Sequence, residues 1–148
     1  MRRNSTLIVI VAAALMAVAA ACGGGGGGDS LAGSTWKMIQ LGPAGFPVPA
    51  MFQVDVNMEL SADGTTIKGS GGCNGYSGSY AVVEDAFTTS NLSWTEIGCT
   101  EPEGIFEQEN RFFGLLASVE TFFIQGDKLT LNAPGDELLV FLRTGGGE

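Results

Sequence analysis

The chain contains no histidine among its 148 residues and only three cysteines. A thiol nucleophile needs a base, usually histidine, to form its thiolate, so these absences argue against a cysteine hydrolase. Zinc would lack ligands, and there is no C-x-x-C redox pair. P-loop, dinucleotide-binding, G-x-S-x-G and EF-hand spacings are also missing. A carboxylate pair for glycoside hydrolysis stays open, but we expect no enzyme, no cofactor and no metal.

Positive charge is also scarce, with seven Lys and Arg against 16 Asp and Glu. Two of the basic residues, Arg2 and Arg3, lie in an N-terminal leader, and without them the formal charge is −11. Nucleic acid and anionic lipid both need Lys and Arg for binding. We therefore expect no nucleic-acid partner, and we interpret the acidity as solubility rather than as an acidic binding face.

The N-terminus predicts export from the cytoplasm. An apolar run from Leu7 to Ala21 is shorter than the roughly 20 residues that span a bilayer, and with Arg2 and Arg3 before it we assign residues 1–21 to a signal peptide. Ala19-Ala20-Ala21-Cys22 resembles a bacterial lipobox, which makes Cys22 the lipidated N-terminus. The same residues fit the A-x-A rule of ordinary secretion, so a released protein is the alternative.

The residues after the signal peptide are expected to form one domain on a flexible tether. Glycines 23–28 make residues 22–33 a flexible linker that favours anchoring, and we assign residues 34–143 to a single domain and 144–148 to a disordered tail. The protein is then a monomer held by the lipid on Cys22 in the bacterial cell envelope, outside the cytoplasm, or is secreted if Cys22 is unmodified.

Most of that domain has the pattern of β-strands. Val54, Val56, Met58 and Leu60 alternate with polar residues, which is typical of an antiparallel strand with one wet face. Asp55, Asn57 and Glu59 on that wet face could hold a hard cation, but solvation is the simpler reading. Further strands are expected at 35–41, 65–70, 86–89, 92–97, 121–125, 128–132 and 137–143.

One helix is expected over about 101–118. Thr100 to Glu103 reads as a capping box, and the apolar residues that recur at helical spacing are Ile105, Phe112, Leu115, Leu116 and Val119. We predict a mainly β fold, a small antiparallel β-barrel-like (lipocalin-like) domain with this helix over one open end. The inward side chains expected to fill the barrel are Met38, Met58, Phe87, Trp94, Phe112 and Phe123.

The glycine-rich stretch 69–80, GSGGCNGYSGSY, reads as a bent strand corner. Tyr76 and Tyr80 share a face at even spacing and are expected to cap the core rather than to bind a ligand. Once Cys22 is set aside, Cys73 and Cys99 remain in an oxidising compartment. A disulfide between them is expected, with two buried free thiols as the alternative.

Two motifs in this order resemble those of a known family. The first contains Gly72, Cys73, Asn74, Tyr76, Gly78 and Tyr80. The second is Thr95-Glu96-Ile97-Gly98-Cys99, where the family commonly has T-x-M-A-C, and a helix with E…FFGLL and a closing hairpin with DKLTL and LLVF follow. Together they resemble the META domain of the HslJ-like heat-inducible lipoproteins, across residues 36–141.

The resemblance implies a lipocalin-like barrel with one helix, often membrane-anchored, and no established enzymatic activity. We therefore expect a non-enzymatic envelope lipoprotein that acts in stress response or envelope integrity. The alternative is a carrier of a small molecule or peptide that uses the barrel interior. Large inward side chains favour a packed core.

Overall fold

The computed structural model describes residues 31–146. The predicted signal peptide at 1–21, the lipidation site Cys22 and the glycine run at 23–28 therefore lie outside the described residues. Within the described part of the chain, no helix is long and apolar enough to cross a membrane.

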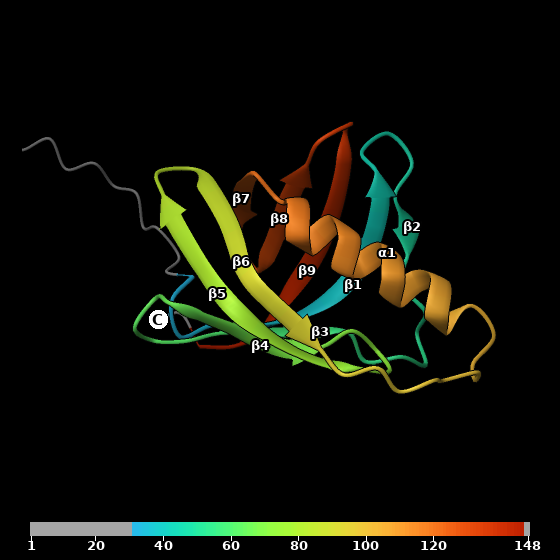
Figure 1. The fold of residues 1–148 in the computed structure, drawn as a ribbon. Coiled ribbons are helices and arrows are strands. Elements are labelled where there is room, and N and C mark those ends of the chain that lie inside the picture. Colours follow the sequence, from blue (N-terminus) through green and yellow to red (C-terminus); the bar gives the residue numbers. More distant parts are fainter. Residues whose placement is uncertain (1–30, 147–148) are drawn as a thin grey trace, which may run out of the picture.

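The strands form one antiparallel sheet that curls into a barrel (Figure 1). In sheet order, β1 is followed by β3 to β9, and β9 pairs back with β1 to close the ring, while the short β2 extends β1. The described strands are β1 (Thr35–Pro43), β2 (Val48–Pro49), β3 (Asn57–Leu60), β4 (Thr66–Ser70), β5 (Gly75–Val83), β6 (Ala86–Trp94), β7 (Thr121–Gln125), β8 (Lys128–Ala133) and β9 (Glu137–Gly145). This confirms the predicted mainly β, barrel-like class.

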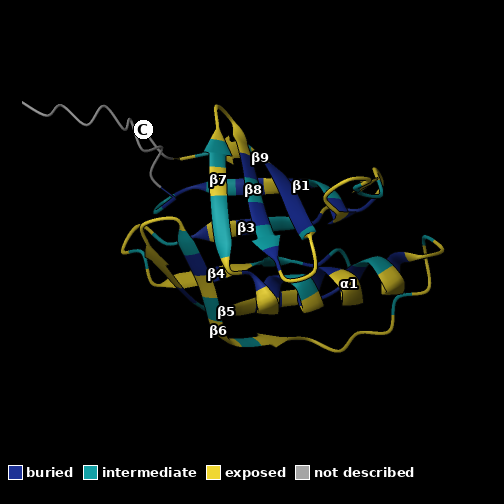
Figure 2. Cartoon of the chain, turned by 90° about the horizontal axis from the view of Figure 1, so that it is seen from above, coloured by how far each residue is buried: buried dark blue, intermediate teal, exposed yellow. Residues whose placement is uncertain are grey.

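Apolar residues of β1, β8 and β9 are buried, and Figure 2 colours much of β1 and part of β8 as buried. The alternation predicted from Val54 to Leu60 is confirmed, because all four apolar residues are buried and Asp55 and Glu59 are exposed. The largest side chains with less than 2 % exposure are Trp36, Phe87, Phe112, Phe141, Met58, Leu60, Ile67, Leu116, Leu129, Leu131, Leu139 and Val56. These residues fill the barrel.

The seam between β6 and β7 is the weakest part of the ring, since they pair only at Ala86 and Thr121. The helix α1 (Ile105–Ser118) packs against β6, β8 and β9 and covers this opening. Phe112 and Leu116 lie on its buried face, and Thr89 Oγ1 on β6 donates to the Leu116 carbonyl at 2.8 Å. The prediction placed the helix over one open end of the barrel, whereas the structure places it against β6, β8 and β9, along this seam.

The predicted start of the helix is wrong. The helix begins at Ile105, and its N-cap is Gly104, at φ 88° and with no side-chain cap hydrogen bond. Thr100 to Glu103 therefore form no capping box. The physical reason is that Gly104 adopts a left-handed backbone conformation, which separates the preceding segment from the helix. The predicted end at about residue 118 agrees with Ser118.

Two of the predicted inward side chains are exposed instead. Phe123 is 59 % exposed because Phe122 and Ile124 take the inward positions of β7, a shift of one residue that reverses the face. Trp94 is the last residue of β6 and is 44 % exposed, with its ring stacked on Phe113 of α1. The other four are buried.

Several strand boundaries also differ from the sequence prediction. β3 begins at Asn57, so Val54 and Val56 are buried but precede the strand, and β1 continues to Pro43. β6 runs without a break from Ala86 to Trp94, where two shorter strands were expected. β9 continues to Gly145 and so includes the first two residues of the predicted disordered tail.

Candidate functional site

The glycine-rich stretch forms the corner between β4 and β5. The Gly71 N–H donates to the Asn74 carbonyl at 2.8 Å and closes a tight turn. Gly72 has φ +117°, and a Cβ there would collide with the side chain of Val54. A Cβ on Gly71 would lie 2.6 Å from Phe113 of α1. Only glycine fits these two positions. The backbone of Gly72 is in the left-handed region, and Gly71 lies too close to the helix for a side chain.

A disulfide ties this corner to the segment that leads into the helix. Cys73 and Cys99 are bonded, with 6.0 Å between their Cα atoms. The predicted pairing is confirmed and the alternative of two free thiols is wrong. Neither sulfur is therefore a nucleophile in this structure.

A buried carboxylate holds the other side of the corner. Glu109 of α1 is 4 % exposed. Its Oε1 accepts the N–H groups of Cys73 at 3.0 Å and Asn74 at 2.6 Å, and its Oε2 accepts Asn74 Nδ2 at 2.7 Å. No Lys or Arg of the described chain forms an ion pair with it. Successive backbone N–H groups and one amide therefore compensate the carboxylate, as in an anion-binding nest.

Asn74 links this carboxylate to the second motif. Its Oδ1 accepts the Thr95 hydroxyl at 2.9 Å and the Ile97 N–H at 2.6 Å. Its Nδ2 also lies 3.3 Å from the Ile97 carbonyl. Donors and acceptors of the buried amide are all used, so it fixes three segments relative to one another.

Glu109 is the residue of this site that the sequence reasoning missed. Its position carries a signal, because residues 105, 109, 112 and 116 recur at three- and four-residue spacing and define the apolar stripe of the helix. A carboxylate on such a stripe needs buried hydrogen-bond donors. The corner of residues 73–74 provides them.

The two motif tyrosines cap the core, as predicted. Tyr76 packs edge-on against Phe112 and Phe113, each with 5.6 Å between ring centres, and its hydroxyl donates to the Asn57 carbonyl at 3.0 Å. Burial raises the pKa of the Tyr76 hydroxyl well above its usual value of 10. Tyr80 stacks on Phe87 with 5.6 Å between ring centres. The hydroxyls of Tyr76 and Tyr80 donate to backbone carbonyls, those of Asn57 and Ser61, while the two rings pack in the core.

Gly78 allows β5 and β6 to approach each other at a register shift between Ser77 and Ser79. A Cβ on Gly78 would lie 2.8 Å from Leu92 Cδ2 and 2.9 Å from the Ser90 carbonyl oxygen. Each of the six residues of the first motif therefore has a structural role, at a turn, a disulfide, a buried hydrogen-bond network, a ring contact or a close contact between strands.

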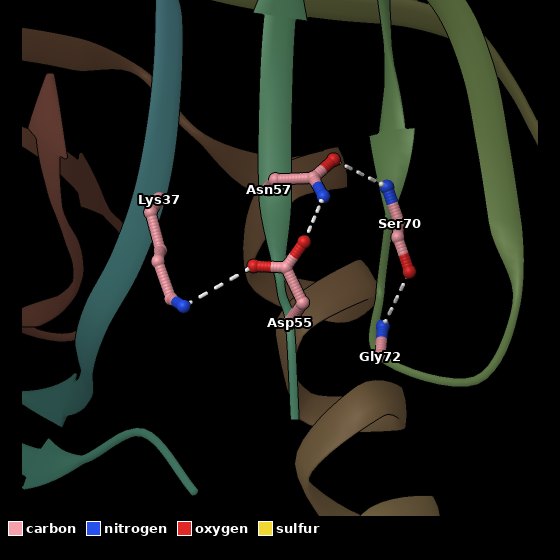
Figure 3. A network of polar contacts seen from close by, with 5 residues as sticks. All are labelled: Lys37, Asp55, Asn57, Ser70 and Gly72. Atoms are coloured by element: carbon pink, nitrogen blue, oxygen red, sulfur yellow. Dashed lines mark hydrogen bonds and ion pairs between the residues drawn. The ribbon is translucent and has the colours of Figure 1, made fainter. Parts of the chain in front are cut away.

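The polar face of the 54–60 segment is engaged in local pairs (Figure 3). Asp55 lies 3.4 Å from Lys37 Nζ and accepts Asn57 Nδ2 at 2.7 Å, and Asn57 Oδ1 accepts the Ser70 N–H at 3.0 Å. Glu59 pairs with Lys68 at 3.1 Å. The described residues contain no group of three or more His, Cys, Asp or Glu that could hold a metal ion.

Two surface depressions flank the corner. One lies on the outer face of β3 to β6 and is lined by Glu59, Lys68, Gly69, Ser77 and Ser93, among others. The second lies between the 94–98 segment and α1, where Trp94 stacks on Phe113 with 4.6 Å between ring centres. Both are lined by polar and apolar residues together.

Comparison with known proteins agrees with this geometry. The META domain family model matches residues 29–145. The chain belongs to the META domain family. The motif residues on which the sequence resemblance rested build the corner, so in this META domain the motif has a structural role. No curated protein matches the chain.

Solved structures share the fold. The META domain is similar to a protein from Burkholderia xenovorans solved by NMR, with 21 % identity, a TM-score of 0.67, and coverage of 78 % of this chain and 85 % of that one. A DUF4847 family protein from Bacteroides vulgatus has 14 % identity and a TM-score of 0.56, over 78 % of this chain and 96 % of that one. META domain proteins are envelope-associated and of uncertain function.

Proposed function

We propose that this META domain protein is a non-enzymatic, lipid-anchored component of the cell envelope that supports envelope integrity under stress. The observation that carries the proposal is the use of the whole shared motif inside the fold. Cys73 is bonded, Asn74 and Glu109 satisfy each other, and Tyr76 donates to a backbone carbonyl. The motif thus supports a stable scaffold rather than a reaction centre.

Anchoring is supported by the sequence that precedes the domain. Cys22 follows a lipobox-like Ala19-Ala20-Ala21, and the glycines after it supply a tether. Multiple acyl chains hold a protein stably at a bilayer, whereas a single chain holds it only weakly. The protein would then act within reach of the membrane surface.

The packed interior supports this proposal over the small-molecule or peptide carrier. Trp36, Phe87, Phe112 and Phe141 each have 0 % exposure and meet inside the barrel. A carrier of this size would need that space for its ligand. The surface depressions described above remain available for a partner, whose identity the proposal leaves to experiment.

Fractionation and complementation test the proposal together. In a strain that lacks the protein, we expect detergent sensitivity that the parent and the tether variant Ser30→Ala both correct. Both proteins should stay in the membrane fraction through a high-salt wash. Cys22→Ser should move to the soluble envelope fraction and fail to correct the defect. Membrane retention of Cys22→Ser, or full correction by it, would contradict the proposal.

A further inference from the structure

The most exposed large apolar side chains of the described chain lie on one loop. We call residues 43–54 the apolar loop; it includes β2 and joins β1 to β3. Phe46 and Phe52 are each 88 % exposed, and Val48 is 49 % exposed. The loop contains no charged residue, although the chain as a whole carries −9. In Figure 1 the turn between β1 and β2 protrudes from the barrel beside α1.

The loop backbone is fixed although its phenylalanines face water. The Ala44 N–H donates to the Asp136 carbonyl at 2.7 Å, and the Ala50 N–H donates to the Ile39 carbonyl at 2.9 Å. The Met51 N–H donates to Gln108 Oε1 of α1 at 2.8 Å. These bonds tie the loop to the barrel and to the helix. The exposure is therefore built into the fold, and it costs free energy until something covers the rings.

The shape and charge of the loop point to a bilayer rather than to a folded partner. Two separate, protruding rings need no complementary pocket in a fluid lipid interface, whereas a protein partner would need one. An uncharged loop also suits lipid that carries no net charge, because the acidic domain would be repelled from anionic lipid. Aromatic side chains partition favourably into the headgroup region of a lipid bilayer.

The tether gives the loop access to such a surface. Eight residues lie between Cys22, the start of the mature chain, and Leu31, so the nine steps from one to the other span at most about 30 Å, at about 3.5 Å per step. β1 carries the chain a further 26 Å or so from Thr35 to the loop, at about 3.3 Å per residue. A domain lying with β1 along the membrane would bring both the tether and the loop to the lipid.

We propose that the apolar loop inserts Phe46 and Phe52 into the interface of an uncharged phospholipid bilayer and orients the anchored META domain on it. The inference rests on the proposed anchoring through Cys22. It adds a second contact with the membrane, made by the folded domain itself.

Bromolipid quenching tests the loop on the full lipidated protein. Phe52→Trp places a fluorophore on the loop, and Phe123→Trp, at a site 59 % exposed on β7, is the matched control. Each is reconstituted in phosphatidylcholine vesicles with brominated acyl chains, and the parent emission from Trp36 and Trp94 is subtracted. Interfacial side chains lie about 5–10 Å into the headgroup and acyl boundary, so a roughly twofold loss is expected for Trp at 52 and little for Trp at 123.

The outcomes separate the loop from the anchor. Quenching at 52 that persists in 0.5 M salt, where the Debye length is only about 4 Å and attraction between exposed charges is largely screened, supports the inference. Equal quenching at both sites, no quenching at 52, or quenching that salt removes would each overturn it. Protein that floats with the vesicles but is unquenched at 52 leaves the anchor intact, whereas protein that does not float contradicts the anchoring proposal.

Discussion

Replacement of Glu109 tests whether its buried carboxylate holds the corner. In Glu109→Gln the remaining carbonyl can still accept the N–H groups of Cys73 and Asn74, but the new NH₂ faces Asn74 Nδ2, which is now 2.7 Å from Oε2. Asn74 cannot rotate its amide to compensate, because its Oδ1 already accepts Thr95 and Ile97. Two donors then face each other in a buried site.

The expected loss follows from the unmade bonds. One lost charge-assisted hydrogen bond and one unpaired buried donor should lower the free energy of unfolding by about 2 kcal/mol in Glu109→Gln. Glu109→Ala leaves three donors without an acceptor and creates a cavity, so about 4 kcal/mol is expected. The total free energy of unfolding of a domain of this size is about 5–15 kcal/mol, so either loss would be a large part of it.

Urea unfolding followed by far-UV circular dichroism measures both changes, with the disulfide kept oxidised. The control is Glu103→Gln, an exposed residue just before the helix, which should change the free energy of unfolding by less than about 0.5 kcal/mol. If Glu109→Gln unfolds at the same urea concentration as the control, with the same slope, the carboxylate does not hold the corner and the reasoning fails.

Three further substitutions probe the core, a buried hydroxyl and a close strand contact. Phe112→Ala empties a fully buried site, so urea unfolding should show a loss of about 3–5 kcal/mol; a loss below about 1 kcal/mol would mean that the helix does not fill the seam. Tyr76 keeps its proton in the folded state after the unfolded chain loses it near pH 10, so parent stability should fall by about 1.4 kcal/mol per pH unit above that value. In Tyr76→Phe this part of the alkaline loss should vanish, and an unchanged slope would contradict the assignment. Gly78→Ala should lower the melting temperature, because its Cβ meets Leu92 and the Ser90 carbonyl, and a stabilised variant would refute that contact.

Much of the fold could be predicted from the sequence because its signals are local. The alternation from Val54 to Leu60 depends only on neighbours in the chain. The disulfide between Cys73 and Cys99 could be predicted because few cysteines were left to pair. A short segment therefore decides the strand pattern, whereas the small number of cysteines decides the disulfide.

The parts that failed depend on contacts distant in sequence. Glu109 was missed because its donors lie 35 and 36 residues away. Phe123 was placed inside because it is the middle of three consecutive apolar residues, although the polar Thr121 and Gln125 share its face of β7. The start of the helix was misplaced because the conformation of Gly104, and not the polar residues before it, separates α1 from the 100–103 segment.

Intact-mass and peptide mass spectrometry of the mature N-terminus test the central claim most directly. Protein purified from the membrane fraction should begin at Cys22 and carry the mass of a diacylglyceryl group, with or without a further acyl chain. A mature chain that begins at an unmodified Cys22, or at any other residue, would contradict the account of a lipid-anchored META domain.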